Sequence, residues 1–218
     1  MTSVFRLEAH PIPDIPVRST FGADGDCVIQ VEVDPRCFEA DPEKAPYLLQ
    51  EQLAKTDDVQ KAALVEKAAA FANTMLDFFV EPMGSIRPTF TFDFTTNDNV
   101  PLAKAGDPVV ITGTWRTHLP AGATTYRVKS MEVCKLAVVF LNTLGGRPVE
   151  RVAVLFPGET SYALDLAGKN AAATSAPPEI TSAPAVATRN GWVKWGLTVL
   201  ALTVAVSLLR WALRRGWV

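Results

Sequence analysis

The chain has 218 residues, of which 48% are hydrophobic, and a formal net charge of −2 at pH 7. Residues 191–218 contain four of the 21 basic residues and none of the 23 acidic residues, so residues 1–190 hold 17 basic and 23 acidic residues. This length allows one soluble domain with its own core, and the acidic balance of residues 1–190 excludes a nucleic-acid-binding protein because phosphates repel an acidic surface.

The first twenty residues are rich in proline, at positions 11, 13 and 16. They contain no apolar stretch of the kind found in secretory signal peptides, and their acidic residues are atypical of Arg-rich transit peptides. We therefore expect a Pro-rich arm before the first strand, without a cleaved targeting signal.

Alternation of apolar and polar residues predicts most of the following elements to be strands. Short turns rich in Gly and Pro separate these segments, and the glycines of NTLGGRP predict a hairpin. The sequence therefore predicts a mainly β fold, namely an antiparallel β-sandwich of immunoglobulin-like or jelly-roll type, with a closed barrel as the alternative. The predicted strands are 27–34, 89–96, 107–119, 126–142, 150–157 and 161–168.

One amphipathic helix is predicted at residues 57–80, within a helical insert at about residues 42–81. Asp57 with Gln60 resembles a capping box, and Pro82 ends the helix. The apolar stripe packs on a sheet face in one interpretation and docks a partner helix in the other. This candidate partner-binding stripe consists of Leu64, Ala68, Phe71, Met75 and Phe78.

A linker is predicted to follow the β-rich domain, which we place at residues 1–166. In residues 167–188, 16 of 22 residues are Ala, Pro, Ser or Thr, and none is aromatic. Such a composition buries too little surface to fold, so residues 167–190 are predicted to be a flexible stalk before a third part at 191–218.

The last part is predicted to be a single transmembrane helix. No charged residue lies between Lys194 and Arg210, and residues 192–213 span about 33 Å as a helix, which matches a hydrocarbon core. A final helix of the soluble core is the alternative. The residues predicted to hold the helix at the two interfaces are Trp192, Lys194, Trp195, Arg210, Trp211, Arg214 and Arg215.

Two further properties of this helix are predicted from its residues. Thr198, Ala201 and Ala205 form a stripe of small side chains along which another membrane helix can pack closely. The position of the helix near the end of the chain is typical of tail-anchored proteins. Its basic end favours a mitochondrial membrane, with a virion membrane as the alternative.

Candidate catalytic residues are few. The two histidines, His10 and His118, have no metal-ligand spacing, and the three cysteines form no CxxC motif. We expect the cysteines, with Cys27 and Cys134 on strands, to be free thiols in a reducing compartment. The segment ADGDC at 23–27 is interpreted as an Asp-Gly turn because it lacks the later ligands of a calcium loop.

The predicted function is that of a non-catalytic, tail-anchored subunit or adaptor of a membrane-bound assembly. Its expected partners are the lipid bilayer and other membrane-protein subunits, without a cofactor, metal, nucleic acid or small-molecule substrate. The alternatives are a membrane-associated structural protein of a virion and a membrane-tethered enzyme. A pocket with His118 beside a carboxylate favours the enzyme, whereas a broad apolar patch favours the adaptor.

Overall fold

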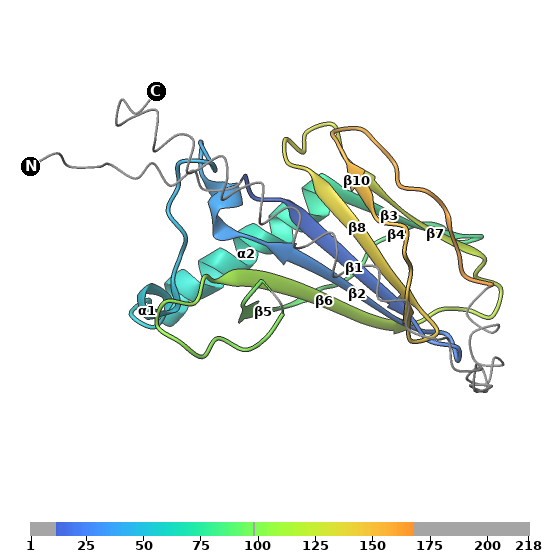
Figure 1. Ribbon diagram of the computed structural model, residues 1–218, viewed down its shortest axis with the longest axis horizontal. Helices are drawn as coiled ribbons and strands as arrows, with labels where there is room; N and C mark the ends of the chain where they lie inside the picture. The colour runs from blue at the N-terminus through green and yellow to red at the C-terminus, as the bar shows by residue number, and fades with distance from the viewer. Residues whose placement is uncertain (1–11, 98, 168–218) are drawn as a thin grey trace, which may run out of the picture. The chain divides into compact units, whose positions relative to one another are not determined.

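The computed structural model describes residues 12–97 and 99–167 (Figure 1). Within these ranges the chain forms eleven strands, two α-helices and one 3₁₀ helix, which confirms the prediction of a mainly β domain. None of the helices in these ranges is both long and apolar enough to cross a bilayer. The predicted anchor at 191–218, all but the first residue of the predicted linker, and His10 lie outside the described residues.

The strands form two sheets (Figure 1). The larger sheet has seven strands in the order β10-β8-β1-β2-β6-β5, with β9 paired to β8, and the smaller sheet has the order β11-β7-β3-β4. The strands are β1 Ile15–Phe21, β2 Asp26–Val33, β3 Leu76–Glu81, β4 Gly84–Ile86, β5 Thr91–Thr95, β6 Val110–His118, β7 Thr125–Ser130, β8 Val138–Leu144, β9 Arg147–Pro148, β10 Ala153–Leu155 and β11 Leu164–Asp165.

The prediction of a wholly antiparallel arrangement is wrong at one strand pair. β1 runs parallel to β8 and antiparallel to β2, within the segment that we expected to be an arm. Prolines argue against a central strand because they lack an N–H donor. Here Pro16 pairs only with Val139 of β8, since the register with β2 begins at Val17. The larger sheet therefore tolerates Pro16 near its centre.

The segment 126–142 forms two strands instead of the single predicted one. β7 ends at Ser130 in the smaller sheet, and β8 starts at Val138 in the larger sheet. Cys134 therefore lies in the connecting loop, where it is buried and its thiol donates to the carbonyl oxygen of Leu136 at 3.4 Å. Cys27 lies on β2 as predicted, and none of the three cysteines forms a disulfide bond.

The helical insert contains the 3₁₀ helix η1 (Pro35–Phe38), α1 (Gln50–Leu53) and α2 (Asp58–Met75). The predicted N-cap of α2 is confirmed, since the Asp57 carboxylate accepts the backbone N–H of Gln60 at 2.7 Å. The predicted end of the helix at residue 80 is wrong because β3 begins at Leu76 without an intervening loop. Burial alternates along β3, and its residues pair with β7, so the strand period prevails over the helical one.

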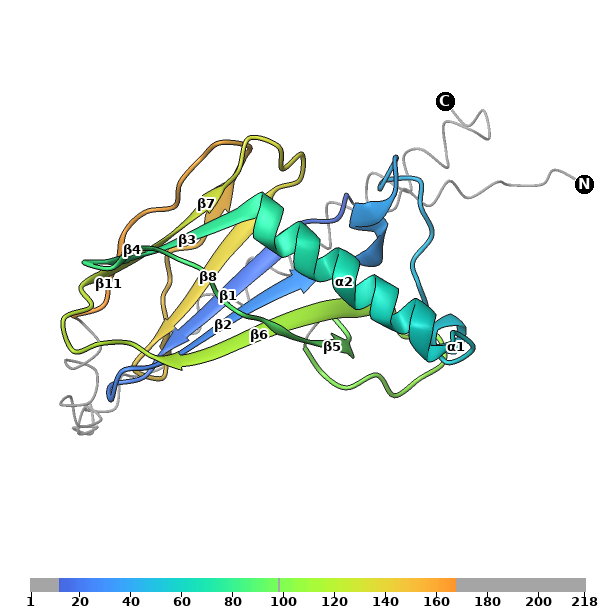
Figure 2. The same ribbon diagram turned by 180° about the vertical axis from the view of Figure 1, so that it is seen from behind.

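The core lies between two layers. Helix α2 and the smaller sheet lie on the same side of the larger sheet (Figure 2), and α2 contacts β2, β5 and β6. Tyr126 of β7 is fully buried and lies 5.0 Å from the ring of Phe21 and 5.6 Å from that of Phe140. Its hydroxyl accepts a hydrogen bond from Ser19 at 2.9 Å. Tyr126 therefore connects the two sheets through both ring contacts and a buried hydrogen bond.

Replacement of Tyr126 is expected to separate these two contributions. Tyr126→Ala opens a cavity between the sheets and lowers the free energy of unfolding by about 3–5 kcal/mol. Tyr126→Phe keeps the ring but removes the hydrogen-bond partner of the Ser19 hydroxyl, and lowers the free energy of unfolding by about 1–2 kcal/mol. Urea unfolding of residues 12–167, followed by fluorescence of Trp115, measures both values. Equal losses for the two variants contradict this account of the core.

Candidate protein-binding surfaces

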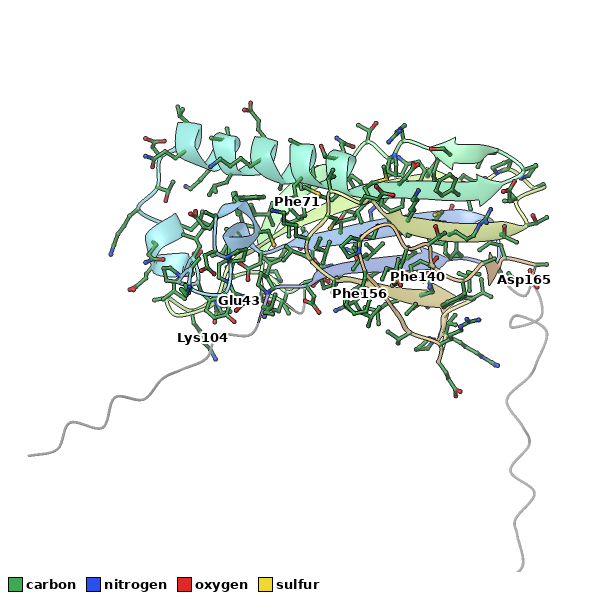
Figure 3. All side chains as sticks on the ribbon, turned by 90° about the horizontal axis from the view of Figure 1, so that it is seen from above. Glu43, Phe71, Lys104, Phe140, Phe156 and Asp165 are labelled. Carbon is green, nitrogen blue, oxygen red and sulfur yellow. The ribbon has the colours of Figure 1, made fainter. Side chains whose placement is uncertain are left out.

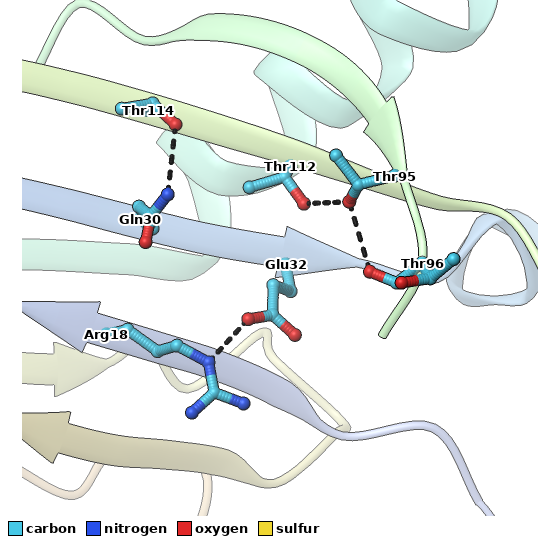
Figure 4. A network of polar contacts seen from close by, with 7 residues as sticks. All are labelled: Arg18, Gln30, Glu32, Thr95, Thr96, Thr112 and Thr114. Carbon is cyan, nitrogen blue, oxygen red and sulfur yellow. Dashed lines mark hydrogen bonds and ion pairs between the residues drawn. The ribbon is translucent and has the colours of Figure 1, made fainter. Parts of the chain in front are cut away.

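The larger sheet has one face turned away from α2 and the smaller sheet, and polar side chains occupy its middle. Arg18 donates from Nε to Oε1 of the buried Glu32 at 2.6 Å, and the hydroxyls of Thr95 and Thr112 share a hydrogen bond of 2.7 Å. These groups satisfy one another across neighbouring strands, so this part of the face is polar yet well bonded. The polar row comprises Arg18, Gln30, Glu32, Thr95, Thr112 and Thr114 (Figure 4).

A polar hollow of about 430 Å³ adjoins this row. Arg36, which is almost completely buried, donates from Nε and Nη2 to Oδ2 of Asp34 at 2.9 and 2.7 Å. Its guanidinium also lies 3.8 Å from the ring centroid of Tyr47. Arg18 and Arg36 are therefore each paired with a carboxylate, as is typical of structural ion pairs.

The same face becomes apolar at its β10 edge. Val152, Val154 and Phe156 are 52%, 51% and 59% exposed, and they alternate with Ala153 and the buried Leu155. Figure 3 shows Phe156 on the side of the molecule away from α2. Such a cluster of exposed, bulky apolar side chains is typical of an interaction surface.

Strand β8 extends this cluster across the sheet. Val154 is opposite Val139, so both side chains point to the same face, and Leu141 follows two positions along the strand. Both β8 side chains are half-buried. We call this cluster the β10 patch, and it consists of Val139, Leu141, Val152, Val154 and Phe156.

Strand β10 also provides an open edge. Among the described residues, β8 is its one partner strand, and β10 ends the order of the larger sheet. An edge strand presents unpaired N–H and C=O groups that an extended segment of another chain can bond. The β10 patch thus combines apolar side chains with backbone hydrogen-bonding groups.

A second surface includes two residues of α2. Here a hollow of about 560 Å³ opens between α2, the residues after η1 and the loop between β7 and β8. Its lining combines apolar side chains with carboxylates, so we call it the acid-rimmed hollow. The residues that define it are Phe71, Met75, Val133 and Leu136, with Glu39 and Glu43 at the rim.

The structure divides the predicted partner-binding stripe among four places. Ala68 lies on the buried face of α2, and Phe78 is buried on β3 instead of on the helix. Phe71 and Met75 pack against the core and also line the acid-rimmed hollow. Leu64 lines a neighbouring hollow of about 530 Å³. The anchor residues and the small-residue stripe, 192–215, lie outside the described part of the chain.

His118 lies beside a carboxylate but on the surface. Its Nδ1 is 3.2 Å from Oδ1 of Asp26, and the two side chains are 64% and 70% exposed. The predicted Asp-Gly turn is present next to this pair, since Gly25 has φ +102° and the N–H of Asp26 bonds the Asp24 carboxylate at 3.1 Å. Water therefore surrounds both members of the pair, in contrast to a positioned acid–base pair in a closed site.

Sequence reasoning missed the β10 patch, although it predicted a strand at 150–157. The run VAVLF places apolar residues on both faces of that strand, a pattern typical of a strand that is covered on both sides. Because β10 lies at the edge of the sheet, the outward set remains exposed. A strand that is apolar on both faces and lies at a sheet edge thus indicates an exposed apolar surface, but the sequence does not show that this strand lies at an edge.

Comparison with known proteins adds no functional assignment. Neither a protein-family model nor a curated protein matches this chain. Functional inference therefore rests on the surfaces themselves.

The thiol of Cys37, which lines the acid-rimmed hollow, is expected to be unreactive. Burial, and to a lesser extent the charge of Asp34, raises its pKa to about 12, so little thiolate is present at neutral pH. Iodoacetamide at pH 8 should modify Cys37 more than about 100-fold more slowly than free cysteine, whose pKa is about 8.5, and more rapidly as the pH rises. Peptide mapping by mass spectrometry measures the rate, and modification at the rate of free cysteine contradicts the expectation.

Proposed function

We propose that the chain is a non-catalytic, membrane-tethered subunit that binds another protein through the β10 patch. The observation that supports the proposal is the exposure of Val152, Val154 and Phe156 along an open sheet edge. A monomeric surface rarely carries such a contiguous apolar cluster without a binding role.

The arrangement of the patch favours an extended partner segment. A partner strand beside β10 gains backbone hydrogen bonds from the edge and continues the larger sheet. Its side chains on the same face then lie next to Val154 and Phe156. Phe156 is the expected anchor of this contact because a buried aromatic ring contributes more to binding than most interface residues.

An adaptor fits the described polar groups better than an enzyme does. The arginines of the polar hollow are paired with carboxylates, and the pair of His118 with Asp26 is open to water. A catalytic acid or base needs a protected position near a bound substrate. A membrane-tethered enzyme is therefore the second candidate function, and the imidazole–carboxylate pair is the observation that favours it.

Membrane attachment through residues 191–218 is part of this proposal. The apolar run between Lys194 and Arg210 and its tryptophan flanks support a single-pass helix. The basic residues after the run favour a mitochondrial membrane over a virion membrane. Packing of Thr198, Ala201 and Ala205 against helices of other subunits completes the proposed assembly.

Removal of residues 168–218 is expected to release a folded, soluble domain. Within the described part of the chain the last buried residue is Leu166, whose N–H bonds the carbonyl oxygen of Thr124 at 2.8 Å, so we expect the truncation to leave the core intact. Carbonate extraction of membranes should leave the full-length chain in the pellet and the truncated chain in the supernatant. Release of the full-length chain by carbonate contradicts a membrane-spanning anchor.

The variant Val154→Glu with Phe156→Ser is expected to weaken partner binding by at least about 30-fold, since it removes the anchor and places a charge in the contact. Folding should be unaffected because both side chains are largely exposed. Blue native electrophoresis of detergent-solubilised membranes measures the loss of the complex.

The matched control is Val59→Glu, which places the same charge on an exposed valine of α2. This control should migrate like the wild type. A photocrosslinking residue at position 156 should also crosslink to the protein that disappears from the variant complex. Complexes of unchanged size and yield in the β10 variant contradict the proposal.

A further inference from the structure

The acid-rimmed hollow has a floor that an apolar side chain can enter. Phe71 and Met75 lie one helical turn apart on α2, and each is half-buried, with one side packed against the core. Val133, which is 58% exposed, forms the opposite wall together with Leu136. Methionine is flexible and polarisable, so this floor can adapt to an inserted side chain.

Contacts with neighbouring segments hold Phe71 and Met75 in place. The ring of Phe71 lies 6.0 Å from that of Phe38 in an edge-to-face arrangement, and Met75 is the last residue of α2 before β3. The backbone N–H of Met131 bonds the carbonyl oxygen of Met75 at 2.9 Å, which connects α2 to the loop that carries Val133. These contacts connect the two walls of the hollow to each other and to η1.

The rim of the hollow is acidic. Glu39 and Glu43 are exposed and have no ion pair within 4 Å among the described residues, whereas Asp41 is paired with Lys44 at 2.7 Å, and the charge of Lys44 also interacts with that of Glu43. Lys135 is the one cationic side chain in the lining. Two unpaired carboxylates beside an apolar floor attract a cationic group and repel an anionic one.

We propose that the acid-rimmed hollow binds a basic segment of a partner protein. The segment inserts one bulky apolar side chain between Phe71 and Val133 and places Lys or Arg side chains against Glu39 and Glu43. The lining of this hollow contains none of the β10 patch residues, so the segment binds a set of residues separate from the one proposed above.

Charge and shape together select this occupant. An acidic segment or a nucleic acid brings anionic groups to Glu39 and Glu43, so the rim disfavours both. A purely apolar segment leaves the two carboxylates unpaired at the border of the contact. The volume of about 560 Å³ lies within the range of sites that bury a side chain or small ligand.

The test uses the full-length chain in detergent micelles with ¹³C-labelled methionine methyl groups. The probe is a short synthetic peptide in which Lys and Arg surround a single Trp, and its control contains Glu in place of every Lys and Arg. The basic peptide should shift the Met75 signal and leave that of Met83, an exposed residue in the β3–β4 turn, unchanged. The acidic peptide should shift neither signal.

Two variants connect the signal to the rim. Glu39→Gln with Glu43→Gln should weaken peptide binding about fivefold, as expected for the loss of two exposed ion pairs. The matched control, Glu51→Gln with Glu66→Gln, removes two exposed carboxylates outside the hollow and should bind like the wild type. Val133→Lys should weaken binding at least tenfold, whereas Val59→Lys should leave it unchanged.

Several results overturn the proposal. They are an unshifted Met75 signal, equal binding of the acidic peptide, and equal binding by the rim variant and its control. A Met75 signal that changes in Arg214→Ser with Arg215→Ser before peptide addition also overturns it, because the basic end of the same chain then occupies the hollow. The peptide titration does not use the Val154→Glu with Phe156→Ser variant. A negative result for the hollow is therefore independent of a negative result for partner binding by the β10 patch.

Discussion

The pairing of β1 with two neighbours holds the larger sheet together. β1 bonds β2 on one side and β8 on the other, so among the described strands it alone connects the β2-β6-β5 half of the sheet to the β8-β9-β10 half. Its inward side chains are buried under the second layer, and its outward Arg18 pairs with Glu32 of β2. The position of the β10 patch therefore depends on a strand from the other end of the domain.

The position of the β10 patch is thus set by contacts between strands that are far apart in the sequence. β1 and β8 are far apart in the sequence, and β10 reaches its place only by pairing with β8. Contacts between distant segments must overcome the entropy of closing long loops. The parallel register of β1 with β8 thus positions an interaction surface whose own strand is only three residues long.

Local patterns in the sequence predicted the strands in which apolar and polar residues strictly alternate, because the alternation lies within one segment. They also predicted the N-cap of α2, because a single side chain, that of Asp57, forms it. The end of α2 was not predictable in this way, since Phe78 satisfies both the helical spacing from Met75 and the strand alternation from Leu76. Pairing with β7 decides between the two periods. The exposure of Val154 and the rim position of Glu39 depend on neighbours that local patterns do not identify.

The direct passage of α2 into β3 has a mechanical consequence. Because no loop separates Met75 from Leu76, α2 is connected directly to β3 of the smaller sheet. A displacement of the helix along its axis therefore acts directly on Leu76, which pairs with Ser130 of β7. A load applied to α2 is therefore carried by the smaller sheet, and through Tyr126 by the larger sheet as well.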